Sequence, residues 1–69
     1  MFTLKYWHLN ESWSTGKMWA SGLMYGHPDY EDGTSVRTSY IVSKETLDDG
    51  YRIVTRSGSV YFLPFESEI

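Results

Sequence analysis

The sequence contains no cysteine, so neither a disulfide bond nor a thiolate metal site can hold the fold together. It also contains no apolar run that approaches the length of a membrane-spanning helix, and we expect no membrane segment. Basic residues are outnumbered, with six Lys and Arg residues against nine Asp and Glu residues and a formal net charge of −3. Because nucleic-acid-binding domains usually carry a basic footprint, this balance disfavours nucleic acid as a partner.

The opening residues 1–5 lack the charged and long apolar regions of a signal peptide, so we expect an intracellular protein. At 69 residues the chain is expected to form one domain that spans residues 1–69. It carries three Trp, six Tyr and three Phe residues. A core of this size cannot enclose so many rings, and several of them are expected on the surface, where a cluster would mark a contact site.

The clearest structural signal is a β-hairpin over residues 51–64. Two runs of β-branched and aromatic residues flank Arg56-Ser57-Gly58, a reverse-turn sequence. A three-residue loop with Gly58 in the left-handed conformation is favoured, because glycine has no Cβ to clash there. This loop places Ile53 opposite Tyr61. The expected core face then consists of Tyr51, Ile53, Tyr61 and Leu63, and the other face of Arg52, Val54, Val60 and Phe62.

Three further strands are predicted from alternating side chains over residues 1–9, 17–25 and 34–43. Gly22 lies within the second of these and indicates a bulge or a sharp bend. Residues 26–33 form a loop by composition, and the polar residues 44–50 are expected to include one helical turn. In the first strand, strict alternation puts Phe2, Leu4, Tyr6 and His8 on one side and Thr3, Lys5, Trp7 and Leu9 on the other.

About five short strands joined by short loops predict an all-β fold. We expect a single small antiparallel sheet that curls into an SH3-like or OB-like partial barrel. A β-sandwich would need more strands than this chain offers.

One group of residues has the chemistry of metal ligands. His27 with Asp29 and Asp32 could offer an imidazole and two carboxylates. The interpretation as a solvated turn is preferred, in which Pro28 sets the bend and the aspartates accept local backbone N–H bonds. We therefore expect neither a metal nor a cofactor.

An acid–base nuclease could in principle use His8, His27 and Glu11, with Arg37 on a phosphate. Nothing in the spacing selects these residues over any other small set. Ser57 and Ser59 flank a glycine, but a nucleophile elbow needs a strand–turn–helix context, and here the context is a hairpin. No catalytic residue is assigned, and the protein is expected not to be an enzyme.

Two surfaces are candidates for a binding partner. Trp13 stands in an otherwise polar stretch and has the character of an interface anchor. Acidic residues cluster in the predicted loops, where they could imitate the phosphate spacing of a nucleic acid; the alternative is that they are solvating charge. The residues predicted to bind a protein partner are Trp13, Asp29, Tyr30, Glu31, Asp32, Asp48 and Asp49.

The alternative partner is a single-stranded nucleic acid. Arg37, Arg52 and Arg56 lie on or beside predicted strands that carry Tyr and Trp residues, and such a combination can form a stacking platform. The net negative charge favours the other interpretation, in which these arginines pair with Asp and Glu across strands.

The second half of the chain resembles small proteins of phages, prophages and plasmids. The shared pattern is Gly26-His27-Pro28, then Asp32-Gly33-Thr34 and Thr38–Val42, and finally the Thr-x-Ser-Gly-Ser-x-Tyr run ending at Tyr61. The resemblance covers residues 22–63. The resemblance implies a mobile-element protein in the cytoplasm of a bacterial host. Small acidic proteins of this setting are often anti-CRISPR or other anti-defence inhibitors.

These observations lead to one hypothesis and two rivals. The first is a non-catalytic protein-binding module that inhibits a host defence protein, such as a CRISPR protein, by occupying its surface. The second is a small OB-like or SH3-like nucleic-acid-binding protein. The third is an accessory phage protein that associates with itself, for example as a homodimer.

Overall fold

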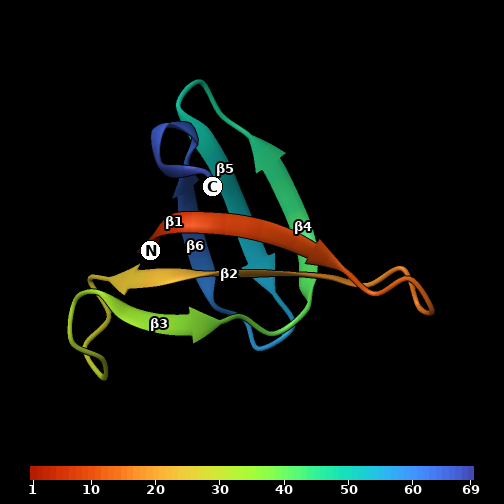
Figure 1. The fold of residues 1–69 in the computed structure, drawn as a ribbon, viewed down its shortest axis with the longest axis horizontal. Coiled ribbons are helices and arrows are strands. Elements are labelled where there is room, and N and C mark those ends of the chain that lie inside the picture. The colour runs from red at the N-terminus through yellow and green to blue at the C-terminus, as the bar shows by residue number, and fades with distance from the viewer.

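The computed structural model describes residues 1–69, and its regular secondary structure is almost entirely β-strand (Figure 1). The all-β prediction is therefore confirmed. In chain order, the elements are β1 (Phe2–Glu11), β2 (Met18–Tyr25), β3 (Thr34–Arg37), β4 (Ile41–Thr46), β5 (Gly50–Thr55), β6 (Val60–Pro64) and the 3₁₀ turn η1 (Phe65–Ser67).

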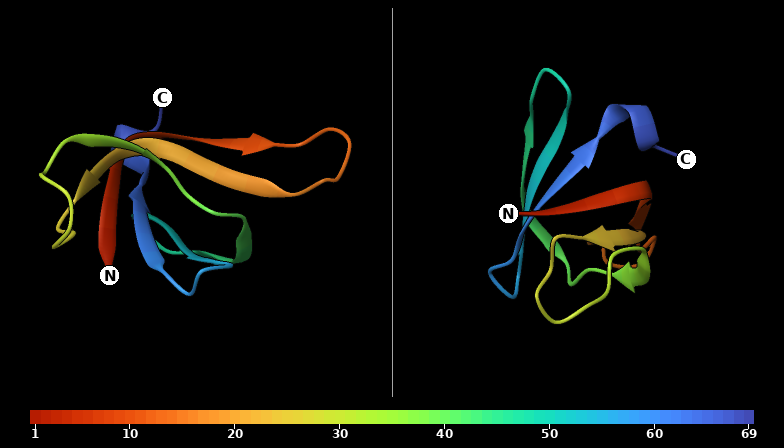
Figure 2. Two further views of the ribbon diagram at one scale, coloured as in Figure 1. Left: turned by 90° about the horizontal axis from the view of Figure 1, so that it is seen from below. Right: turned by 90° about the vertical axis from the view of Figure 1, so that its left-hand side faces the viewer.

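All six strands belong to one sheet with the order β3-β2-β1-β6-β5-β4. Neighbouring strands are antiparallel except β1 and β6, which run parallel. The sheet is bent, so that β1–β3 lie across β4–β6 (Figure 2). The buried core residues come from both halves of the sheet. It is not closed into a barrel, since β3 and β4 are its two edges. The expected curled sheet thus has six strands rather than five and includes one parallel pair.

The predicted hairpin is present with the predicted register. Ile53 lies opposite Tyr61 and Tyr51 opposite Leu63, and Gly58 has a φ of 87°. The N–H of Thr55 donates to the carbonyl oxygen of Ser59 at 3.0 Å, which closes the three-residue loop. The hairpin register could be predicted because the turn and both strands are local in sequence.

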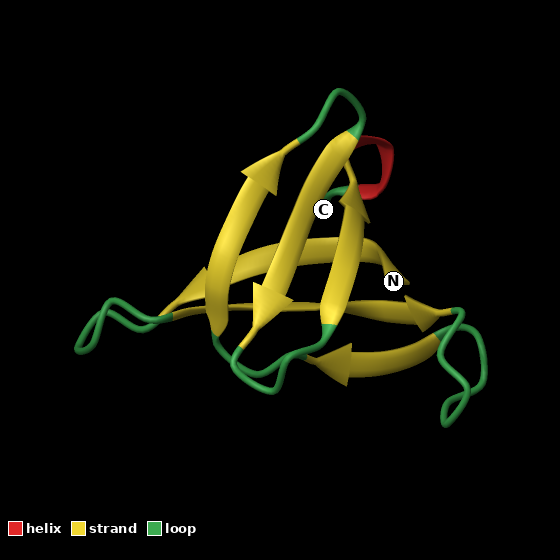
Figure 3. Cartoon of the chain, turned by 180° about the vertical axis from the view of Figure 1, so that it is seen from behind, coloured by secondary structure: helices red, strands yellow, loops and turns green.

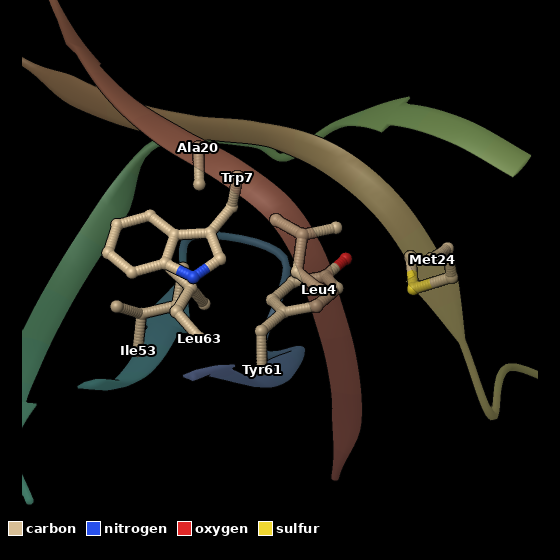
Figure 4. Close-up of a cluster of buried hydrophobic side chains, with 7 residues drawn as sticks. All are labelled: Leu4, Trp7, Ala20, Met24, Ile53, Tyr61 and Leu63. Carbon is tan, nitrogen blue, oxygen red and sulfur yellow. The ribbon is translucent and has the colours of Figure 1, made fainter. Parts of the chain in front are cut away.

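The core is formed by side chains from both halves of the sheet. Trp7 is fully buried between them, and its indole ring meets the ring of Tyr51 edge-on with centroids 5.8 Å apart. Partly buried side chains, among them Phe2 and Ile41, pack around this cluster. Its buried hydrophobic members, drawn in Figure 4, are Leu4, Trp7, Ala20, Met24, Ile53, Tyr61 and Leu63.

A β-bulge in β1 contradicts the strict alternation expected for the first strand. Lys5 pairs with Leu23 and His8 pairs with Ser21, so two residues of β1 stand opposite the single residue Gly22. The backbone at Tyr6, one of the two, has a φ of 51°. The extra residue reverses the faces beyond it, and Leu4 and Trp7 are therefore both buried. Gly22 was expected to mark a bulge, and it does so from the opposite strand.

The strand predicted over residues 34–43 is divided into β3 and β4 by a segment that crosses from one half of the sheet to the other. Thr38 fastens this segment to β2: its N–H donates to the carbonyl oxygen of Ala20 at 2.9 Å, and its Oγ1 accepts from the N–H of Ala20 at 3.0 Å. At the other end, the N–H of Arg56 donates to the carbonyl oxygen of Tyr40 at 2.7 Å. The segment can therefore not continue as one straight strand.

The helical turn expected in residues 44–50 is absent there. β4 continues to Thr46, and the N–H of Leu47 donates to the carbonyl oxygen of Gly50 at 2.8 Å to close a tight turn. The helical element of the chain is η1, after β6 (Figure 3). A membrane-crossing helix, which would need far more length and apolarity, is not found.

Candidate functional site

The structure does not bring the predicted partner-binding residues together. Trp13 lies in the β1–β2 loop, residues 29–32 lie in the β2–β3 loop, and Asp48 and Asp49 lie in the β4–β5 loop. In Figure 1 the first two loops project from opposite ends of the molecule, and the third stands at the top. These residues therefore form three separate surfaces rather than one.

Trp13 is the most exposed aromatic residue of the chain, with 96% of its surface accessible. It sits in a tight hairpin loop, in which the N–H of Ser12 donates to the carbonyl oxygen of Lys17 at 2.8 Å. The N–H of Gly16 donates back to the carbonyl oxygen of Ser12 at 2.7 Å. These bonds close the loop on itself, and the exposure of the indole ring shows that it has almost no contact with the rest of the protein.

The acidic β2–β3 loop is organised by its own hydrogen bonds. Asp32 Oδ1 accepts from the N–H of Gly26 at 3.0 Å, and the Nδ1 atom of His27 accepts from the N–H of Asp29, also at 3.0 Å. The His27 ring packs against Phe2, with 4.3 Å between the ring centroids. No group of three or more His, Asp or Glu side chains has an arrangement that could hold a metal ion. In this structure His27 and Asp32 act as turn-forming residues.

A cavity of about 330 Å³ lies where the β4–β5 loop meets η1. One part of its wall is apolar and aromatic, and the other part carries carboxylates. The N–H of Phe65 donates to the carbonyl oxygen of Asp49 at 2.9 Å, which holds the two parts together. Such a site suits a cationic group on an apolar stem, such as a lysine or arginine side chain. The cavity is lined by Asp48, Asp49, Phe62, Pro64, Phe65 and Glu66.

The three arginines proposed for nucleic-acid binding are also separated. Arg52 on β5 forms an ion pair with Glu45, with 3.7 Å between Nη1 and Oε1, as the cross-strand interpretation expected. Arg56 lies in the β5–β6 turn. Arg37 on β3 lies over the ring of Trp19, with its Cζ atom 4.6 Å from the ring centroid. Only Arg37 therefore has the aromatic partner that a stacking platform requires.

Sequence reasoning missed a set of side chains that the sheet register assembles around Arg37. On the outward face of β1–β3, Lys5 Nζ lies 5.0 Å from the centroid of the Tyr25 ring. Beside β2, Lys17 Nζ lies 5.0 Å from the Tyr40 ring, which in turn meets Trp19 edge-on. Trp19 and Tyr25 share a face because they are an even number of residues apart on β2, but the cations Lys5 and Arg37 come from the neighbouring strands. We name this set, Lys5, Lys17, Trp19, Tyr25, Arg37 and Tyr40, the basic–aromatic face.

Comparison of the chain with protein-family models, with curated proteins and with solved structures found no match. Three surfaces of the chain could contact a partner: the Trp13 loop, the cavity lined by Asp48, Asp49 and Glu66, and the basic–aromatic face.

Proposed function

We propose that this protein is a non-catalytic protein-binding module whose contact element is the β1–β2 loop. The observation that carries the proposal is the exposure of Trp13, 96% of whose surface is accessible, at the end of a hairpin that projects from the sheet (Figure 1). A tryptophan that contributes nothing to its own core is available to fill a pocket on another protein. Tryptophan is among the residues that most often dominate binding energy.

The expected contribution of Trp13 is large for a single side chain. An aromatic side chain buries roughly 150–250 Å², and apolar area removed from water contributes about 25 cal/mol per Å². The upper estimate is therefore roughly 4–6 kcal/mol, before the cost of ordering the loop is subtracted. A net loss of about 2 kcal/mol or more on truncation to alanine is the scale of a hot spot.

The negative charge of the acidic loops is complementary to a partner with a basic surface. The cavity beside Asp48, Asp49 and Glu66 joins carboxylates to an apolar wall, which matches the charged head and the apolar stem of a lysine or arginine side chain. The carboxylates of the β2–β3 loop are exposed and lie at the far end of the molecule. Peripheral charges of this kind mainly steer encounter and raise the association rate.

The resemblance to small proteins of phages, prophages and plasmids supports a more specific role. In that setting the partner is a host defence protein, such as a CRISPR protein, and the module inhibits it by covering a basic surface. No step of bond making or breaking is required of this chain.

The test begins with capture of partners from a bacterial lysate on the immobilised protein, alongside a Trp13→Ala variant. A protein retained by the parent is then purified and measured by surface plasmon resonance at two salt concentrations. We expect Trp13→Ala to weaken binding by roughly thirtyfold or more, which corresponds to about 2 kcal/mol. Val42→Ala is the control, because Val42 is also an exposed apolar residue, at 64%, but lies on β4.

A Trp13→Ala variant that binds as tightly as the parent would exclude the β1–β2 loop as the contact element. Neutralising Asp29, Glu31 and Asp32 should mainly slow association and reduce its salt dependence. The partner could also be a second copy of the chain. Sedimentation of the parent and of Trp13→Ala at high concentration reveals that case, since only the parent would then form a dimer.

A further inference from the structure

We propose that the basic–aromatic face binds single-stranded nucleic acid, as a second surface that does not include Trp13. The proposal rests on the juxtaposition of Arg37 with Trp19 and of Lys5 with Tyr25, at 4.6 and 5.0 Å from the ring centroids. Each pair presents a flat stacking group beside a positive charge. That is the combination with which proteins hold unpaired bases and the phosphates between them.

The register of the sheet places both pairs on one side of β1–β3. Leu23 lies opposite Lys5 on the β1 side and opposite Ser35 on the β3 side, and Ser21 lies opposite His8 and Arg37. Trp19 and Tyr25 lie on the same side of β2 as Ser21 and Leu23, because residues two apart along a strand point to the same side. Trp19 and Tyr25 are six residues apart along β2, a span of about 20 Å. This length suits a short single strand, at the lower end of the site sizes known for small β-barrel domains, about 4 nucleotides.

The local charge of this face differs in sign from the net charge. Although the whole chain has a net charge of −3, β1–β3 contain a single carboxylate, that of Glu11. Glu11 follows the outward residue Asn10 and therefore alternates to the other side of β1. The remaining carboxylates lie in loops or on the other half of the chain. The basic–aromatic face thus carries three cations, Lys5, Lys17 and Arg37, and no carboxylate lies at an outward position of β1–β3.

The geometry favours a single strand over other anionic partners. Arg37 is exposed, and its Cζ atom lies 4.6 Å from the centroid of the Trp19 ring. Its planar guanidinium group is therefore accessible to an unpaired base, which can stack on such a plane. Its N–H groups can at the same time donate to a phosphate. In a duplex the base faces are already stacked on one another, and an acidic peptide has no ring to place on these groups.

Binding is measured by fluorescence anisotropy with a labelled oligo-dT of about 12 nucleotides, within the site sizes of such domains. We expect a dissociation constant of about 10⁻⁴ M or lower at about 50 mM salt, with clear weakening at about 200 mM salt. Arg37→Gln should weaken binding by about tenfold, since it removes a stacking plane and a phosphate contact. Lys5→Gln should reduce the magnitude of the slope of log binding constant against log salt concentration by about 0.7, the value for one phosphate contact to a single strand.

The controls are Arg52→Gln and Lys44→Gln. Each removes one positive charge, as the test variants do, but Arg52 is paired with Glu45 and Lys44 lies over Tyr51 in the other half of the sheet. Both should bind within about twofold of the parent, since neither positive charge lies on the basic–aromatic face. Lys5 and Arg37 are exposed, so circular dichroism should show both variants folded. Tyr25→Leu serves as a further variant that removes a ring without changing charge.

Several results would overturn the proposal. One is the absence of binding at about 50 mM salt. Another is equal weakening by the test and control variants, which would mean that only net charge matters. Equally tight binding of duplex DNA or of a Glu-rich peptide would show a charged patch without base stacking. Finally, amide chemical shifts induced by oligo-dT should map to the outward residues of β1–β3, and a map confined to other strands or loops would contradict the assignment.

Discussion

The indole Nε1–H of Trp7 donates a hydrogen bond of 2.7 Å to the backbone carbonyl oxygen of Pro64, 57 residues further along the chain. Both residues are buried. The bond joins the bulged strand β1 to the end of β6, where η1 begins. The carbonyl oxygen of Trp7 accepts in turn from the N–H of Ile69 at 2.8 Å. Trp7 therefore fills the core and also fastens the C-terminal segment onto the first strand.

Trp7→Phe should destabilise the protein by about 2–4 kcal/mol. The smaller ring leaves part of the core unfilled, and the buried oxygen of Pro64 loses its indole donor. Denaturant unfolding followed by circular dichroism measures the change in free energy. Trp13→Phe is the matched control: it makes the same chemical change at a residue that is 96% exposed, and its effect should stay within about 0.5 kcal/mol. Similar losses in both variants would contradict the assigned role of Trp7.

Gly22→Ala should destabilise the protein by about 1–3 kcal/mol, the usual cost of overpacking. A Cβ atom at this position would lie 2.9 Å from both Leu4 Cγ and the carbonyl oxygen of Lys5, and 3.1 Å from the Cα atom of Trp7. The bulge in β1 thus occupies the space that a side chain on β2 would need. Thermal unfolding compares this variant with Ser35→Ala, on the exposed edge strand. An unchanged melting temperature for Gly22→Ala would mean that the bulge is placed incorrectly.

Gly58→Val should cost about 1–3 kcal/mol, because Gly58 has a φ of 87° and a β-branched residue resists positive φ. No atom lies within 4 Å of the position of an added Cβ, so the loss would come from the backbone and not from a clash. Gly58→Asn is the control, since asparagine tolerates the left-handed conformation better, and it should lose clearly less stability. Equal losses for Val and Asn would indicate that the turn has another conformation.

Thr38→Val should destabilise the protein by about 1–3 kcal/mol, although the two side chains have nearly the same shape. The hydroxyl of Thr38 accepts from the N–H of Ala20 at 3.0 Å and donates to the carbonyl oxygen of Ser39 at 2.8 Å. Valine would leave the Ala20 N–H without this acceptor next to the core. Thr38→Ser keeps the hydroxyl and should retain most of the stability. Urea titration distinguishes the two variants, and a serine variant weaker than the valine variant would contradict this role for the hydroxyl.

The part of the fold that could be predicted is the part encoded by neighbouring residues. The 51–64 hairpin follows from alternation and from one glycine in the turn, and its register and core face are both confirmed by the pairing of Ile53 with Tyr61. The all-β class follows from the same local patterns.

Side-chain alternation predicted the wrong faces or bounds of a strand where that strand's conformation depends on contacts with another strand. Trp7 was assigned to the face opposite Leu4, yet both are buried, because an extra residue in β1 is accommodated by the missing side chain of Gly22 on β2. The expected single strand over residues 34–43 failed for a similar reason, since Thr38 is held by Ala20, 18 residues earlier. Neither partner is visible from the local pattern.

For the candidate sites, the local pattern of residues is enough to show that Trp13 stands among polar residues and that the acidic residues gather in loops. It could not show that these loops point in different directions, that Arg52 is paired with Glu45, or that Arg37 and Lys5 lie over aromatic rings of β2. Turns and alternation depend on covalent geometry within a few residues. Which side chains contact a charged residue depends on strand order and register, and these are established when distant segments bury a common core.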